Sequence, residues 1–191
     1  HVPSCMDRRG FGDSCTLGNG EPTRATSSGG IRVSRTNPCL WFDGTAEEAA
    51  TLYVSIFPNS AIHEIARSPG DYHAGTSGSV LAVRFTLDGA PFLALNGGPY
   101  FKPTPAISFQ IECADQEEVD HYWKALGEEG GTPGQCGWLV DRFGISWQVN
   151  PKELGGLIGG PDREGAARAQ QAMMGMGRLV IEDLRRAYEG R

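Results

Sequence analysis

DGTAEEAATLYVSIF at residues 43–57 and CADQEEVDHYWKAL at residues 113–126 are two copies of one short pattern. In each copy a residue that caps helices, Thr45 or Asp115, stands three positions before a glutamate, which is the spacing of a capping box. Apolar residues then recur every three or four positions, so each copy predicts an amphipathic helix. The expected apolar stripes are Ala49, Leu52, Tyr53 and Ile56 in the first copy and Val119, Tyr122, Trp123 and Leu126 in the second.

Each helix is expected to follow a strand, because apolar residues alternate with other residues just before it, in NPCLWFDG at 37–44 and AISFQIE at 106–112. In the first stretch Leu40 and Phe42 are predicted to face one side of the sheet, while Cys39 and Trp41 face the other. Turn-rich loops separate the further strands that are expected after each helix, at 61–67, 79–87 and 91–96, and then near 130–134, 136–141 and 145–149.

The repeat therefore predicts an α+β fold of two βαβββ modules, at about residues 37–98 and 105–151. Each sheet would be apolar toward its helix and mixed on its other face. Two such sheets that curl together form an incomplete barrel, and their mixed faces line a cleft. We expect residues 1–36 to be a flexible leader. Residues 152–191 are expected to form a helical tail, with helices at 166–176 and 181–188, that packs on the barrel or docks on a twofold partner.

Charge and composition limit the kinds of partner that the chain is expected to bind. The net charge of -6 is uneven, because residues 1–36 carry five arginines and three acidic residues, which leaves 12 basic and 20 acidic residues in the rest. An acidic body repels phosphate backbones, so nucleic acid is not expected as a partner. No apolar run approaches the roughly 18–20 residues that cross a membrane. The chain has five cysteines, an odd number that cannot all pair in disulfides within the chain. A cytoplasmic protein is the resulting expectation.

Three stretches of the sequence resemble a known family. LWFDGTAEEAATLYVSIFPNS, FLALNGGPYFKPTPAISFQIECADQEEVDHYW and CGWLVDRFGISWQVNP together cover most of residues 37–151. They are similar to the vicinal oxygen chelate superfamily of glyoxalase and bleomycin-resistance proteins. Within it the resemblance is to the PhnB-like branch, often labelled 3-demethylubiquinone-9 3-methyltransferase. The resemblance implies the paired-module barrel, and it implies a homodimer because two-module members of the superfamily commonly dimerise.

The resemblance also says where a metal ion would be held. Enzymes of the superfamily use one His, Glu or Gln side chain from each of four strands. Aligning the strands by their apolar alternation places these four positions at Asn37, Ala94, Ala106 and Gln148. Two methyl groups and two neutral amides do not make a transition-metal site, so no metal and no other cofactor is expected.

The same alternation predicts which side chains face the cleft. Aromatic walls with a few neutral donors and acceptors suit a planar or partly apolar small molecule. Cys39 and Cys136 have no histidine at a neighbouring strand position, so no catalytic residue is assigned. The expected ligand-binding residues are Cys39, Trp41, Phe92, Asn96, Ser108, Gln110 and Gln148, with Phe101 and Trp138 as neighbours; Ser146 is also expected to face the cavity.

Three functions remain open at this point. The first is a metal-independent small-molecule binding domain of the sequestering or resistance type. The second is an enzyme of the same superfamily, either a metal-dependent lyase or dioxygenase or a methyltransferase acting on a quinol. The third is a structural or partner-binding homodimer whose cleft is filled by its own side chains.

Overall fold

The computed structural model describes residues 36–191. The expected leader at residues 1–36 lies almost entirely outside the described residues. None of the helices within 36–191 is long and apolar enough to cross a membrane.

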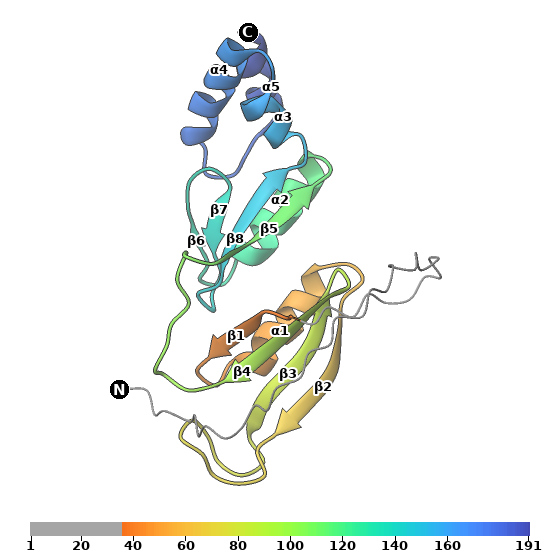
Figure 1. Ribbon diagram of the computed structural model, residues 1–191, viewed down its shortest axis with the longest axis vertical. Helices are drawn as coiled ribbons and strands as arrows, with labels where there is room; N and C mark the ends of the chain where they lie inside the picture. The colour runs from red at the N-terminus through yellow and green to blue at the C-terminus, as the bar shows by residue number, and fades with distance from the viewer. Residues whose placement is uncertain (1–35) are drawn as a thin grey trace, which may run out of the picture. The chain divides into compact units, whose positions relative to one another are not determined.

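The first module contains one helix and one four-stranded sheet, which can be followed in Figure 1. Its elements are β1 (Cys39–Phe42), α1 (Ala46–Ile56), β2 (Ala61–Arg67), β3 (Val80–Leu87) and β4 (Ala90–Asn96). The strand order is β1-β4-β3-β2, with β1 parallel to β4 and the other pairs antiparallel. Asp88 and Gly89, both with positive φ, form the tight turn between β3 and β4.

The second module repeats this arrangement. Its elements are β5 (Ser108–Cys113), α2 (Gln116–Gly127), β6 (Thr132–Pro133), β7 (Trp138–Val140) and β8 (Ser146–Pro151). The order β5-β8-β7-β6, with β5 parallel to β8, matches the first sheet strand for strand. The predicted pair of βαβββ modules is therefore confirmed, and both sheets are open.

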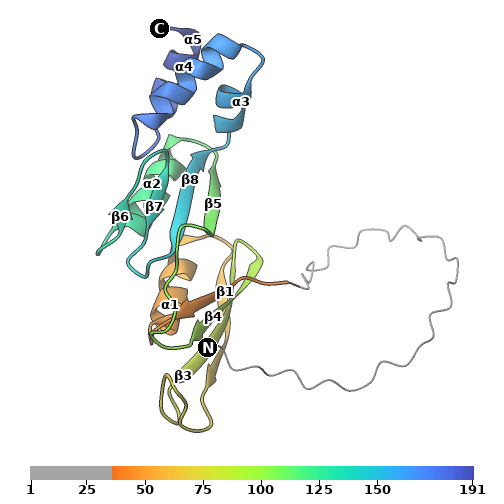
Figure 2. The same cartoon turned by 60° about the vertical axis from the view of Figure 1, so that its left-hand side comes forward.

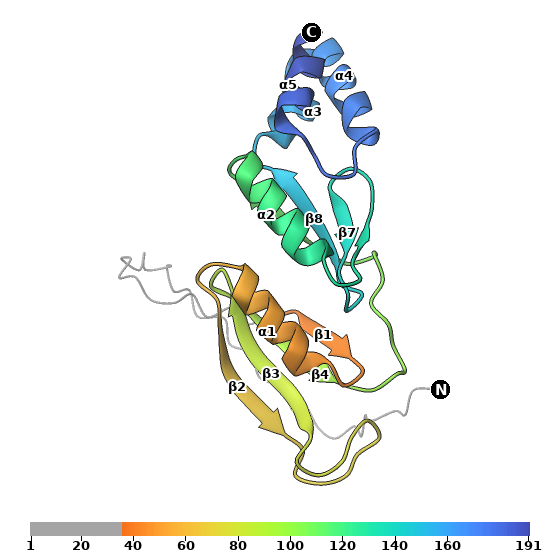
Figure 3. The ribbon, with the colours of Figure 1, turned by 180° about the vertical axis from the view of Figure 1, so that it is seen from behind.

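Each helix covers one face of its own sheet, as Figure 3 shows. We call the other face of each sheet its open face. Leu40 and Phe42 of β1 are buried toward α1, whereas Cys39 and Trp41 lie on the open face, as predicted. In the second sheet Ile111 and Trp147 are buried toward α2. The open-face residues of this sheet are Ser108, Gln110, Glu112, Trp138, Val140, Ser146, Gln148 and Asn150.

The orientation expected for β4 was wrong by one residue. Leu93 and Leu95 lie beside Cys39 and Trp41 on the open face. Phe92 instead stacks on Phe85 on the α1 side, and Asn96 accepts a hydrogen bond there from the backbone N–H of Ala46 at 3.0 Å. The stretch PFLAL is apolar at every position, so its sequence carries no alternation from which the two faces could be assigned.

That contact also changes how α1 begins. Thr45 is the N-cap residue, but its side chain makes no capping hydrogen bond among the described residues. The side chain of Asn96 takes over this role from β4. In α2 the expected capping box is present, because Asp115 accepts from the N–H of Glu118 and Glu118 accepts from the N–H of Ala114.

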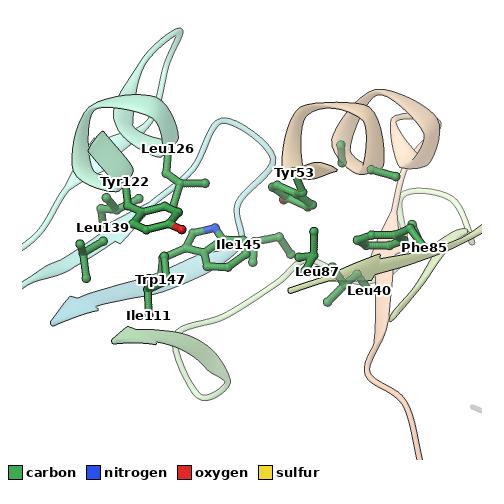
Figure 4. Packing of buried hydrophobic residues seen from close by; sticks show 14 of the residues in the cluster. Leu40, Tyr53, Phe85, Leu87, Ile111, Tyr122, Leu126, Leu139, Ile145 and Trp147 are labelled. Carbon is green, nitrogen blue, oxygen red and sulfur yellow. The ribbon is translucent and has the colours of Figure 1, made fainter. Parts of the chain in front are cut away.

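One hydrophobic core runs through both modules. Tyr53 of α1 packs edge-on against Trp147 of β8, with 5.4 Å between the ring centroids. Phe57 stacks on the same indole, and Phe92 meets Phe109 across the modules at 5.3 Å. Figure 4 shows Tyr53 beside Ile145 and Trp147. The two modules are therefore joined by aromatic side chains on their helix sides.

The tail contains three helices, which can be followed in Figure 2. These are α3 (Leu154–Gly159), α4 (Arg163–Met174) and α5 (Ile181–Glu189). The last two were expected, whereas α3 was not, because LGGLIG is rich in glycine and has low helix propensity. The buried residues Leu154, Leu179 and Leu184 form the tail's own small core.

Hydrogen bonds join the tail to the second module. Gln116 of α2 donates to the carbonyl of Leu179 and accepts from the N–H of Ile181. The N–H of Cys136 donates to the carbonyl of Met176 at 2.7 Å. The tail thus packs on its own module, one of the two arrangements that the sequence left open.

Burial of Cys113 is expected to make the fold less stable at alkaline pH. This thiol is fully buried, and burial, with smaller contributions from Glu118 and Asp115, raises its pKa from 9.0 to about 12. A thiol whose pKa is higher in the folded than in the unfolded state contributes stability that is complete below the unfolded pKa and is lost as pH rises above it. The loss therefore begins near pH 9.

We expect Cys113 to lower the free energy of unfolding by up to about 1 kcal/mol between pH 8 and pH 10. Urea denaturation under reducing conditions at both pH values measures the change. Cys113→Ala is the comparison, because it removes the titrating group but keeps the fold. A variant with the same pH dependence as the original chain over this range would contradict the assignment.

Candidate functional site: two pockets on the open faces

A pocket of about 540 Å³ lies where β1, the start of β8 and the segment 97–107 between the modules come together. We call it the linker pocket. Its walls are mostly apolar: they come from β1, from the segment between the modules and from the beginnings of β5 and β8. The large apolar residues of its walls include Trp41, Phe101, Ile107, Phe109 and Ile145.

Trp41 is held in one orientation in this pocket. Its indole Nε1 donates to the carbonyl of Gly98 at 2.8 Å, and Phe101 packs edge-on with 5.1 Å between ring centroids. The ring lies directly against Gly97, where an added Cβ would be 2.2 Å from the ring atom Cζ2. Only glycine fits beneath the ring, so the backbone itself positions this aromatic wall.

One buried polar group lines the linker pocket. Ser146 is 2% exposed, and its Oγ has no hydrogen-bond partner within the described part of the chain. Leaving such a hydroxyl without a partner costs about 1–3 kcal/mol, so buried groups of this kind are uncommon in native folds. At the rim, Lys102 is exposed and forms no ion pair with any residue of 36–191.

A second pocket of about 380 Å³ lies on the open face of the second sheet, and the tail forms its opposite wall. We call it the tail pocket. The sheet contributes Trp138 and three carboxamides, those of Gln110, Gln148 and Asn150. The tail contributes Leu154, Gly155, Ile158 and Met173.

The predicted ligand-binding residues are divided between these pockets. Cys39, Trp41 and Phe101 line the linker pocket, whereas Gln110, Trp138 and Gln148 line the tail pocket. Ser108 accepts a hydrogen bond from Gln148 Nε2 at 2.8 Å. Phe92 and Asn96 point toward α1 and line neither pocket.

Sequence reasoning missed the pocket residues contributed by the tail and missed Asn150. Asn150 could have been found, because it continues the two-residue period that begins at Ser146 and Gln148. The residues of α3 could not, because nothing in a glycine-rich stretch indicates which surface it will cover.

The side chains present do not fit the metal centre that the resemblance implies. Ala94 is fully buried on the α1 side, and Asn37 and Ala106 are exposed on segments outside the strands. Only Gln148 lies on an open face, and its amide nitrogen is bonded to Ser108. Across residues 36–191 no three side chains of His, Cys, Asp and Glu are grouped closely enough to hold a metal ion.

Comparison with known proteins places most of this chain in one family. The family model described as 3-demethylubiquinone-9 3-methyltransferase matches residues 34–150. A solved PhnB protein from Bacillus cereus, described by the same methyltransferase name, is 32% identical, with a TM-score of 0.53, and the match covers 60% of this chain and 97% of that one. PA1353 from Pseudomonas aeruginosa is 20% identical, with a TM-score of 0.50, over 60% of this chain and 95% of its own. None of the curated proteins matches significantly.

Proposed function

Because the chain belongs to the 3-demethylubiquinone-9 3-methyltransferase family, the PhnB-like branch of the vicinal oxygen chelate superfamily, we propose that it binds a small molecule in the linker pocket without a metal ion. The observation that carries this proposal is a pocket with apolar and aromatic walls in which the Trp41 ring is held in one orientation. A homodimer and a cytoplasmic location remain predictions from the sequence.

The chemistry of the pocket indicates the class of ligand. Trp41 and Phe101 offer flat apolar surface to a ligand. Lys102 at the rim adds a positive charge that favours an anionic substituent on the outer end of the ligand. The best match is a planar aromatic molecule with an anionic group at its outer end.

The turn from β1 to α1 does not support the methyltransferase activity of the family name. Nucleotide cofactors commonly bind the free N–H groups of a glycine-rich turn that leads from a strand into a helix. Here the turn from β1 to α1 is Asp43-Gly44-Thr45, and the first N–H of the helix, that of Ala46, already donates to Asn96. This turn is therefore not arranged for a phosphate.

A fluorescence titration with 8-anilinonaphthalene-1-sulfonate tests the proposal, because this probe is aromatic and anionic and brightens in apolar sites. The chain is expected to bind it saturably, and Trp41→Ala is expected to weaken binding at least tenfold, since burial of a large side chain against a ligand contributes about 1.5–3 kcal/mol.

Trp138→Ala is the matched control, because it removes a tryptophan from the open face of the other sheet, in the tail pocket. It should change the affinity for the probe by less than a factor of two. Thermal unfolding of both variants checks that they are folded. Equal weakening by the two substitutions, or no saturable binding by the original chain, would refute the linker pocket as the binding site.

A further inference from the structure

We propose that the tail pocket is a second binding site, which takes a planar nitrogen heterocycle of the nucleobase type. It is independent of the linker pocket, with which it shares no lining residue. The family model ends at residue 150, whereas one wall of this pocket comes from Leu154, Ile158 and Met173. The site is therefore completed by a part of the chain that lies beyond the match to the family.

The floor of the pocket presents carboxamides whose hydrogen-bonding capacity is unused. Asn150 is 8% exposed, and its side chain forms no hydrogen bond within residues 36–191; its Oδ1 is buried beside Gly137, so Nδ2 is the atom of this amide that a ligand can reach. Gln148 uses Nε2 to donate to Ser108 but leaves its carbonyl oxygen without a partner among the described residues. A buried amide with no partner destabilises the fold, so its presence on the wall of a pocket points to a ligand that completes its bonds.

The arrangement of these amides selects the type of ligand edge. Gln110 lies directly beside Gln148 across the β5–β8 pair, and Asn150 is two residues further along β8 on the same face. A carboxamide without other partners among the described residues, such as that of Gln110, offers a donor and an acceptor side by side. The complementary edge carries an adjacent donor and acceptor, as the exocyclic amine and ring nitrogen of adenine do, and Asn and Gln bind such an edge with two hydrogen bonds.

The walls suit a flat ring. Trp138 provides an aromatic surface on the sheet side, and Ile158 and Met173 provide apolar surface on the tail side. Aromatic side chains stack on heterocyclic bases, with a contribution of about 1–3 kcal/mol for each base. Glu112 and Lys152 also line the pocket, and their opposite charges favour an uncharged heterocycle over an anion or a cation.

Isothermal titration calorimetry with adenine tests this site. The full chain is expected to bind adenine saturably, and to bind indole, a bicyclic ring without the amine and ring-nitrogen acceptors, at least tenfold more weakly. Asn150→Leu, which keeps the size of the side chain and removes its hydrogen bonds, should also weaken adenine binding at least tenfold.

Two controls separate a binding role from a structural one. Asn150→Leu should unfold at the same temperature as the original chain or a higher one, because it removes an unpartnered amide from the interior. Trp41→Ala should leave adenine binding unchanged, whereas Trp138→Ala should weaken it, the reverse of the result expected for the anionic probe. Failure of the chain to bind adenine, equal binding of indole, or full binding by Asn150→Leu would each overturn the proposal without touching the linker pocket.

Discussion

Asp141→Ala is expected to lower the free energy of unfolding by about 3–5 kcal/mol, because several buried donors then lose their acceptor at once. The carboxylate is 4% exposed. Its Oδ2 accepts from the Tyr53 hydroxyl at 2.7 Å and from Trp147 Nε1 at 2.8 Å. Its Oδ1 accepts from the backbone N–H groups of Phe143 and Ile145, at 2.8 and 3.0 Å.

These bonds make Asp141 the polar link between the modules. Tyr53 comes from α1 of the first module, and the other three donors lie in the β7–β8 region of the second. Burial, and then the charge of Asp141, raises the pKa of Tyr53, so the phenol remains a donor at neutral pH. Loss of the carboxylate is therefore expected to loosen the packing between the modules. It is also expected to loosen the turn between β7 and β8, where Phe143 and Ile145 lie.

Urea denaturation of three variants measures this effect. Tyr53→Phe removes one donor and leaves the carboxylate with three, so it should cost only about 1 kcal/mol. Asp43→Ala removes an exposed carboxylate and should stay within about 0.5 kcal/mol of the original chain. If Asp141→Ala cost no more than Tyr53→Phe, Asp141 would not be the link described here.

Gly137→Ala is expected to destabilise the fold by about 3 kcal/mol, because it combines backbone strain with a steric clash. Gly137 has φ of +81°, in the left-handed region that favours glycine. An added Cβ would lie 2.8 Å from the carbonyl oxygen of Val149 and 2.9 Å from Oδ1 of Asn150. The neighbouring backbone is fixed, since the N–H of Gly137 donates to Gly177 and its carbonyl accepts from Val149.

Gly44→Ala separates the two causes. Gly44 has nearly the same φ, +83°, but an added Cβ there would meet nothing within 4 Å. This variant should therefore show the strain alone, about 1–2 kcal/mol. The two free energies of unfolding, measured in urea, should differ by at least about 1 kcal/mol. Equal values would mean that the β8 backbone moves aside and that the clash has no cost.

The sequence was informative about the fold wherever apolar residues kept a regular period. The two helices and the alternation in β8 could be read because their buried and open-face positions differ in chemistry, as in Trp147 against Gln148. The orientation of β4 could not be read, because an all-apolar strand looks the same from both sides. The role of Asn96 as the cap of α1 was invisible for a different reason, since it joins residues 50 positions apart.

The candidate site was only partly predictable for the same physical reasons. Period two identified which side chains of the second sheet share its open face, including Gln110 and Gln148. It could not show that aromatic and amide groups belong to separate pockets, because that depends on the segment between the modules and on the tail. Phe101 packs against Trp41 because of the course that the segment between the modules takes. The sequence of that segment has no regular hydrophobic period from which this course could be predicted.

A titration with 8-anilinonaphthalene-1-sulfonate after removal of metal ions decides whether the linker pocket binds its ligand without a metal. The chain would be dialysed against EDTA, checked for residual metal by elemental analysis, and titrated with and without added Zn²⁺, Mn²⁺ or Mg²⁺. The same affinity is expected in every case. Loss of binding after dialysis, restored by one of these ions, would show that the linker pocket needs a metal ion.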